Sequence, residues 1–128
     1  LNCYYPLSKS KRPSDRELRK AWKQVVAKIE RVHGRYQRPI IFTEIGFRSV
    51  NHPWLNPHED DQGRPFNEAD QRRCYEIVFK GINDKPWCAG ILWWKWPSYL
   101  AYRGAENTGF TPYNKSTEAL IAEWFDKL

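Results

Sequence analysis

The sequence predicts an α/β fold that forms part of a (β/α)8 barrel. Short apolar stretches alternate with longer stretches whose apolar residues recur at helical spacing, in the order strand–helix, strand–helix, strand–helix. This alternation indicates parallel strands joined by helical crossovers. Both long connections, residues 46–66 and 97–113, follow predicted strands. Because loops after strand ends build the active sites of such folds, we expect the functional residues there.

The first unit begins with residues 1–5, which have the pattern of the tail of a strand, and Pro6 stops it. Ser14 and Glu17 form a capping-box pattern, in which each side chain bonds to the other residue's backbone at the start of a helix. Gly34 is expected to end this helix. The apolar positions on one of its faces are Leu18, Trp22, Val25, Ile29 and Val32.

The second unit opens with a short apolar strand at residues 40–43, which leads into Glu44, Ile45 and Gly46. Its helix follows the first long connection. Asn67, with an aspartate three residues further on, is a suitable cap for that helix. The buried face of the helix is predicted to hold Cys74, Ile77, Val78 and Ile82.

The third unit has an apolar strand at residues 89–94 and a helix that begins near Ser116. The apolar residues of that helix are Leu120, Ile121, Trp124 and Phe125. Three strands covered by helices on one side leave the other face of the sheet bare. A complete barrel needs eight strands and about 250 residues, whereas this chain has 128. We therefore expect residues 1–128 to be an incomplete barrel that needs missing N-terminal strands or a second copy.

Composition and charge argue against several classes of protein. No apolar run approaches the roughly 20 residues that span a bilayer, and no signal-peptide pattern is visible, which leaves the compartment open. The net charge of +6 is uneven, because residues 1–38 carry eleven Lys and Arg against three Asp and Glu. These charges lie between helix-spaced apolar residues, so a solvated helix face is favoured over binding to nucleic acid or a membrane.

Neither a metal nor a cofactor is expected. The three cysteines are widely spaced and form no CxxC pair: Cys3, Cys74 and Cys88. A group of acidic residues and histidines in the first long connection matches no common ligand spacing, and a solvated loop is favoured for His52, His58, Glu59, Asp60 and Asp61.

Glu44 is the sharpest candidate for chemistry. It stands where an apolar strand ends and a long connection begins, so a rigid strand would hold a partly desolvated carboxylate at the mouth of the fold. Such a carboxylate suits a nucleophile or a proton-transfer group. A glutamate that merely ends a strand and meets solvent or an arginine is equally compatible with the position alone.

Aromatic residues favour the first interpretation. Side chains alternate along a strand, which places Trp94 and Trp96 on one face and Trp93 with Lys95 on the other. Trp94 and Trp96 then share a rim with Glu44, where their rings can stack on a sugar. Tyr4 or Tyr5 ends the first strand on the same rim, and a hydroxyl there can hydrogen-bond the carboxylate. Simple aromatic packing is the alternative.

Three segments together resemble Glycoside Hydrolase Family 113: residues 41–50 (IFTEIGFRSV), 85–96 (KPWCAGILWWKW) and 108–115 (TGFTPYNK). The opening residues 4–8 are similar to the end of the sixth barrel strand in such enzymes, and Gln71 with Cys74 and Tyr75 fits the family's helix after the long connection. The resemblance implies a retaining glycosidase with a (β/α)8 barrel that acts on β-mannans. Residues 1–128 would then be its C-terminal portion, about the last three βα units.

The resemblance also implies residue roles. Glu44 takes the position of the nucleophile, and Trp94 takes the position that floors the sugar subsite. Tyr4 or Tyr5 takes the place of the tyrosine that contacts the nucleophile. Lys95 and Trp96 are further candidate substrate contacts.

One departure from the family concerns the acid/base carboxyl that retaining hydrolysis also needs. In the family this is a glutamate after an asparagine at the fourth strand, and here the pair Asn67–Glu68 opens a helix instead. The first hypothesis is therefore a β-mannanase-like fragment that carries the nucleophile half of the site and is inactive on glycans alone. The second is a non-catalytic half-barrel that binds carbohydrate or associates with itself, and anion binding by the basic helix is a weaker third.

Overall fold

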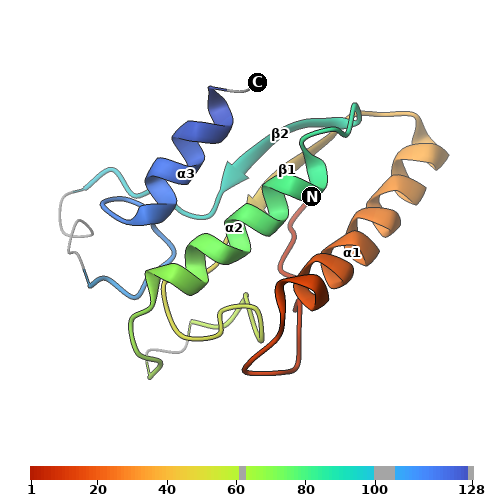
Figure 1. Cartoon of the computed structure of the whole chain (residues 1–128). Helices are drawn as coiled ribbons and strands as arrows, with labels where there is room; N and C mark the ends of the chain where they lie inside the picture. The colour runs from red at the N-terminus through yellow and green to blue at the C-terminus, as the bar shows by residue number, and fades with distance from the viewer. Residues whose placement is uncertain (61–62, 100–105, 127–128) are drawn as a thin grey trace.

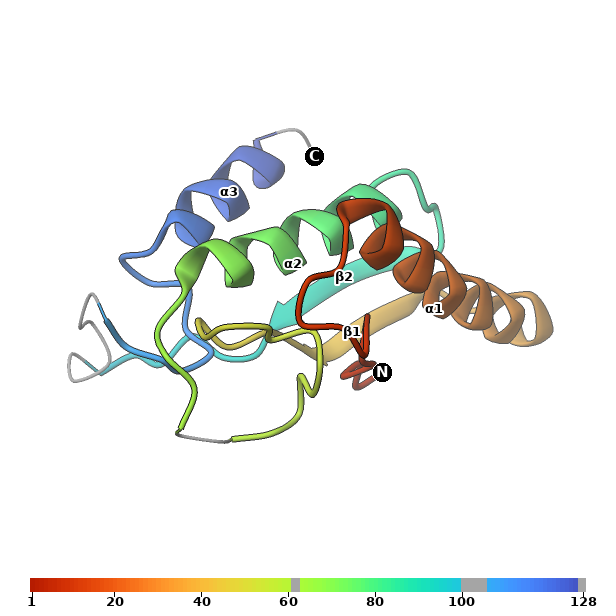
Figure 2. The same cartoon turned by 60° about the horizontal axis from the view of Figure 1, so that its bottom comes forward.

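The computed structural model describes residues 1–60, 63–99 and 106–126 of the chain. In this part of the chain the elements run α1 (Asp15–Tyr36), β1 (Ile40–Ile45), α2 (Glu68–Ile82), β2 (Cys88–Trp93) and α3 (Ser116–Phe125). The two strands pair in parallel, with Ile40 opposite Cys88 and Ile45 opposite Trp93. Helix α2 lies over one face of this sheet, with α1 and α3 on either side of it (Figures 1 and 2). The predicted α/β alternation is confirmed for the second and third units.

The expected strand at residues 1–5 is not formed. Asn2 makes one parallel bridge to Glu44, and the Cys3 amide donates to the Glu44 carbonyl at 2.7 Å. The segment has β1 on one side, no strand among the described residues on the other, and Pro6 directly after it. Because Pro6 has no amide proton, it ends the pairing early, and the segment lies along β1 without forming a strand.

Both predicted helix caps are confirmed. The Glu17 amide donates to Ser14 Oγ at 3.2 Å, and the Ser14 amide donates to Glu17 Oε2 at 2.6 Å. The Asp70 amide donates to Asn67 Oδ1 at 2.9 Å. The expected stop at Gly34 is wrong, because the helix continues to Tyr36. The left-handed conformation that ends it is adopted by Gln37, whose amide donates to the His33 carbonyl at 2.7 Å.

The core lies between the helices and one face of the sheet. Trp22 of α1 is buried, and its indole nitrogen donates to the Val78 carbonyl of α2 at 3.2 Å. Phe42 and Ile45 point from β1 into this core. Trp93 of β2 stacks on Tyr75 of α2 with ring centroids 4.2 Å apart, so it packs under the helices as its strand position predicts.

Two residues predicted to be buried are exposed instead. Val32 faces an open groove that it shares with Tyr5 and Ile41, and Phe125 faces a second groove with Trp124. Helical spacing correctly identified the apolar face in each case. However, the described part of the chain has no element that covers these ends of the face, so both side chains meet solvent.

The opposite face of the sheet is bare. Ile41 of β1 is 49% exposed and Leu92 of β2 is 61% exposed, whereas their neighbours Phe42 and Trp93 pack against the helices. The alternation of buried and exposed side chains is that of a sheet covered on one side. Ile41 and Leu92 therefore place large apolar side chains on an exposed face of the sheet.

Candidate functional site

The backbone around Glu44 is held from both sides. The N-terminal segment bonds to it through the Cys3 amide. One residue later, the Ile45 carbonyl accepts a hydrogen bond from the Trp94 amide at 2.8 Å. Glu44 is half-buried between the buried residues Phe42 and Ile45 of the same strand. Its carboxylate therefore stands on a rigid element at the end of β1, as the sequence predicts.

Tyr4 contacts this carboxylate. Its hydroxyl donates to Glu44 Oε2 at 3.2 Å. The pKa of Tyr4 is raised well above its ordinary value by burial, and further by the hydrogen bond to Glu44 and the charge of that carboxylate. Tyr4 therefore stays a neutral donor across the physiological range. Tyr5 lies elsewhere, in the groove beside α1, with its ring centroid 5.3 Å from Lys28 Nζ.

Glu44 and Tyr4 line an open cavity of about 450 Å³, which we call the Glu44 cavity. Trp94 and Lys95 line it too, and Lys95 Nζ is 5.7 Å from the centroid of the Trp94 ring. Trp96 does not line it; its ring is edge-on to Tyr113, with centroids 6.5 Å apart. The remaining lining residues are Arg48, His58, Asp60, Pro97 and 107–111.

Gly46 allows the end of β1 to approach Trp94. A Cβ atom on Gly46 would lie 1.9 Å from the Trp94 carbonyl oxygen and 3.0 Å from its carbonyl carbon. The absence of a side chain is therefore what brings Trp94 to the same cavity as Glu44.

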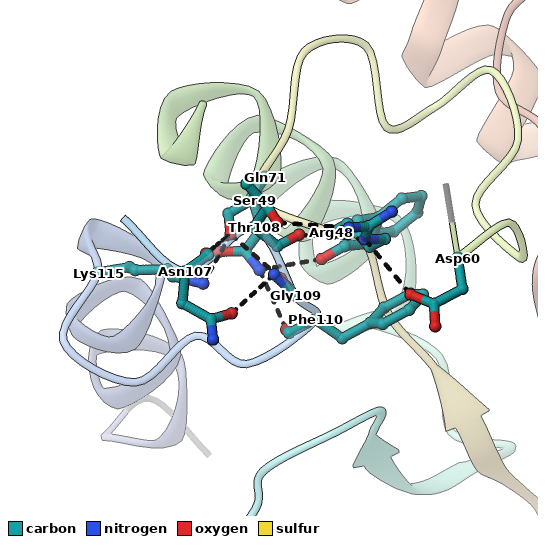
Figure 3. Close-up of polar contacts among 10 residues, drawn as sticks. Arg48, Ser49, Asp60, Gln71, Asn107, Thr108, Gly109, Phe110 and Lys115 are labelled. Atoms are coloured by element: carbon teal, nitrogen blue, oxygen red, sulfur yellow. Dashed lines mark hydrogen bonds and ion pairs between the residues drawn. The ribbon is translucent and has the colours of Figure 1, made fainter. Parts of the chain in front are cut away.

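Residues 107–111, which we call the wall segment, form one side of the cavity and are fixed by buried polar side chains (Figure 3). Arg48 Nε donates to the Thr108 carbonyl at 3.1 Å. The Ser49 hydroxyl donates to the Asn107 carbonyl at 2.6 Å. Gln71 of α2 donates from Nε2 to the carbonyls of Phe47 and Phe110, at 2.9 and 3.1 Å.

Lys115 completes this set of contacts. Nζ donates to Ser49 Oγ at 2.6 Å and to the Thr111 carbonyl at 2.7 Å. The pKa of Lys115 is lowered to about 8, chiefly by burial; the charge of Glu68 acts in the opposite direction, and the charge of Arg48 adds to the lowering. Sequence reasoning gave Arg48, Ser49 and Lys115 no role. The one available signal was their place in the two segments that resemble the family.

The pKa of Lys115 predicts a pH dependence of stability. Between about pH 8 and pH 10.5, Lys115 keeps its proton in the unfolded chain but has released it in the folded chain. The unfolding equilibrium constant therefore falls as the pH rises, by up to about tenfold per pH unit. We expect the free energy of unfolding of the wild type, minus that of Lys115→Met, to increase across this window. Urea titrations at several pH values measure the difference, and a flat difference would contradict the shifted pKa.

Two further findings concern metal-ligating side chains and membrane-spanning helices among the described residues. No group of three or more His, Cys, Asp and Glu side chains is placed to hold a metal there; Asp61 lies outside the described residues. His52 instead bonds through its amide to Asp70 Oδ2 at 2.9 Å. Among the described helices, none combines the length and hydropathy needed to cross a bilayer.

Solved structures with the same fold include three β-mannanases. The chain superimposes on a GH113 β-1,4-mannanase determined as a complex with a TM-score of 0.79 and 22% identity, over 98% of this chain and 37% of that one. A second GH113 β-1,4-mannanase superimposes with a TM-score of 0.77 and 23% identity, over 94% of this chain and 38% of that one. The β-mannanase AaManA from Alicyclobacillus acidocaldarius, in complex with ManMIm, superimposes with a TM-score of 0.76 and 24% identity, over 94% of this chain and 37% of that one.

The chain thus spans a little over a third of the length of these structures. No curated protein sequence matches it. The sequence model of Glycoside Hydrolase Family 113 matches residues 2–115, which include Glu44, Trp94, Lys95 and the wall segment. The chain belongs to Glycoside Hydrolase Family 113.

Proposed function

We propose that this chain carries the nucleophile half of a retaining β-mannanase active site, with Glu44 as the nucleophile. The observation that carries the proposal is the convergence of three side chains at one cavity. Glu44 lines this cavity, the Tyr4 hydroxyl bonds to Glu44 Oε2, and Trp94 lines the same cavity. A carboxylate beside an aromatic face in an open groove suits a polymer of sugar rings.

In the proposed reaction, the Glu44 carboxylate attacks the anomeric carbon as the bond to the leaving-group oxygen breaks. A glycosyl ester forms on Glu44. A second carboxyl about 5–5.5 Å away protonates the leaving oxygen and later takes a proton from the water that releases the sugar. We propose that this second group comes from the rest of the barrel, so that the 128-residue chain alone does not hydrolyse mannan. Mannan hydrolysis by the purified chain, lost in Glu44→Gln, would overturn this part.

Tyr4 and Trp94 have distinct proposed functions. Tyr4 donates to Oε2 and so orients the carboxylate while staying uncharged itself. Trp94 offers its ring as the floor of a sugar subsite, and Lys95, which lies beside that ring, is a further candidate contact.

Replacing Trp94 by alanine tests the sugar subsite. We expect mannotetraose affinity, measured by isothermal titration calorimetry, to fall by up to about tenfold, because a stacked aromatic face contributes about 0.5–1.5 kcal/mol beyond the area that it buries. Trp96→Ala is the matched control, since Trp96 lies outside the Glu44 cavity; its effect should be smaller. Equal losses in the two variants, or no binding by the wild type, would contradict the subsite.

The bare sheet face favours a second candidate, a half-barrel that associates with itself. Ile41 and Leu92 are exposed there, and a second copy could cover them as well as the missing strands could. Light scattering after size-exclusion chromatography separates the two. A dimer that Leu92→Glu dissociates supports self-association, whereas a monomer with poor thermal cooperativity supports a portion of a larger barrel.

A further inference from the structure

Lys115 contacts the wall segment and does not line the Glu44 cavity. It is only 5% exposed, yet it carries an ammonium group with two hydrogen bonds. We propose that Lys115 is a positioning residue for sugar binding, which acts through Ser49 and Thr111 to hold the wall segment against the end of β1. The proposal rests on the proposed function, because it takes the Glu44 cavity as the sugar site.

The contacts of Lys115 join the two ends of the wall segment. At one end Nζ donates directly to the Thr111 carbonyl. At the other it donates to Ser49 Oγ, which lies within hydrogen-bond distance of the Asn107 carbonyl at 2.6 Å and of the Gly109 carbonyl at 3.1 Å. Ser49 is buried completely and follows β1 by four residues. One ammonium group thereby links Thr111, at one end of the wall segment, to Ser49, which bonds to the other end and follows the strand of Glu44 by four residues.

The backbone of the wall segment depends on the same residues. The Ser49 amide donates to the Gly109 carbonyl at 3.1 Å. The Gly109 amide donates to Asn107 Oδ1 at 2.7 Å. Residues 107–111 all line the Glu44 cavity, so a displacement of this backbone changes the shape of the cavity.

A lysine at this buried position requires a physical reason. Burial disfavours the charged form, and an apolar side chain of similar length would avoid that cost. The ammonium instead supplies directed donors to an oxygen on each of two separate segments, which an apolar side chain cannot do. The need to hold the wall segment in one position therefore explains the buried ammonium group of Lys115 better than side-chain packing alone does.

Lys115→Met removes the donors and keeps the length of the side chain. We expect hydrogen exchange in residues 106–111 to accelerate about tenfold, since the Thr111 carbonyl loses its buried donor and the wall segment loosens. Exchange is read by mass spectrometry on the full chain without ligand. Lys80→Met is the matched control, because Lys80 is an exposed α2 residue paired with Glu76, and its exchange pattern should equal that of the wild type. Ser49→Ala should accelerate exchange in the same residues to a smaller extent.

Mannotetraose affinity separates positioning from general stability. We expect Lys115→Met to bind about tenfold more weakly, with the same stoichiometry. Val26→Ala, which lowers stability in the core of α1, should leave affinity unchanged. Unchanged exchange in Lys115→Met overturns the proposal, as does accelerated exchange with unaltered affinity. If the wild type itself does not bind mannotetraose, the proposed function fails, and exchange alone decides whether Lys115 holds the wall segment.

Discussion

Replacing Glu44 by glutamine should abolish the burst of phenolate that we expect from an aryl β-mannoside with a strongly acidic leaving group. Such a phenol departs without protonation, so attack by the nucleophile is sufficient even without the second carboxyl. Slow release of the sugar then gives a burst followed by little turnover. The burst rate should fall on the order of 10³-fold or more, because the amide cannot form the ester.

The matched control is Glu76→Gln, which changes a carboxylate of α2 that pairs with Lys80 outside the cavity. It should keep the burst of the wild type in a stopped-flow assay. A burst that persists in Glu44→Gln would show that another group attacks the sugar.

Gly46→Ala should both destabilise the fold and weaken sugar binding. The new Cβ would lie 1.9 Å from the Trp94 carbonyl oxygen. Because both atoms belong to or are fixed to backbone, the backbone at position 46 or at Trp94 has to move. Gly46 has no positive φ, so the cost comes from this steric contact and not from backbone conformation. We expect a loss of about 2–4 kcal/mol in the free energy of unfolding. Mannotetraose affinity should fall as well, because Trp94 is pushed away from Glu44.

Gly90→Ala is the control for this substitution. Gly90 lies in β2, and a Cβ there meets no atom within 4 Å. Its free energy of unfolding, from urea titration, should stay close to that of the wild type, or rise slightly through lower entropy of the unfolded chain. Similar losses for the two glycines would contradict the close approach of Gly46 to Trp94.

Local signals in the sequence predicted the features that depend on local contacts. The caps at Ser14 and Asn67 involve residues three positions apart, so the pattern itself contains both partners. The position of Glu44 followed from the end of an apolar strand. Which tyrosine contacts it could not be predicted, because that depends on how residues 1–5 lie along β1, some 40 residues away.

Long-range contacts explain what the sequence did not predict. The contact from Lys115 to Ser49 joins residues 66 positions apart, and no periodicity reports such a pair. Val32 and Phe125 were placed on the correct faces, but helical spacing cannot show whether another element covers that part of the face. The same limit applies to the wall segment, whose position depends on side chains from three separate regions.

The identity of the residue that attacks the sugar is tested most directly by covalent labelling. In 2-deoxy-2-fluoromannosyl fluoride the fluoride leaves as an anion, and the fluorine at C2 slows release of the sugar from the ester. We predict one label per 128-residue chain, on Glu44 when the digested peptides are sequenced by mass spectrometry, with labelling slowed by mannotetraose. A label on another carboxylate such as Asp60, or no label at all, would contradict Glu44 as the nucleophile.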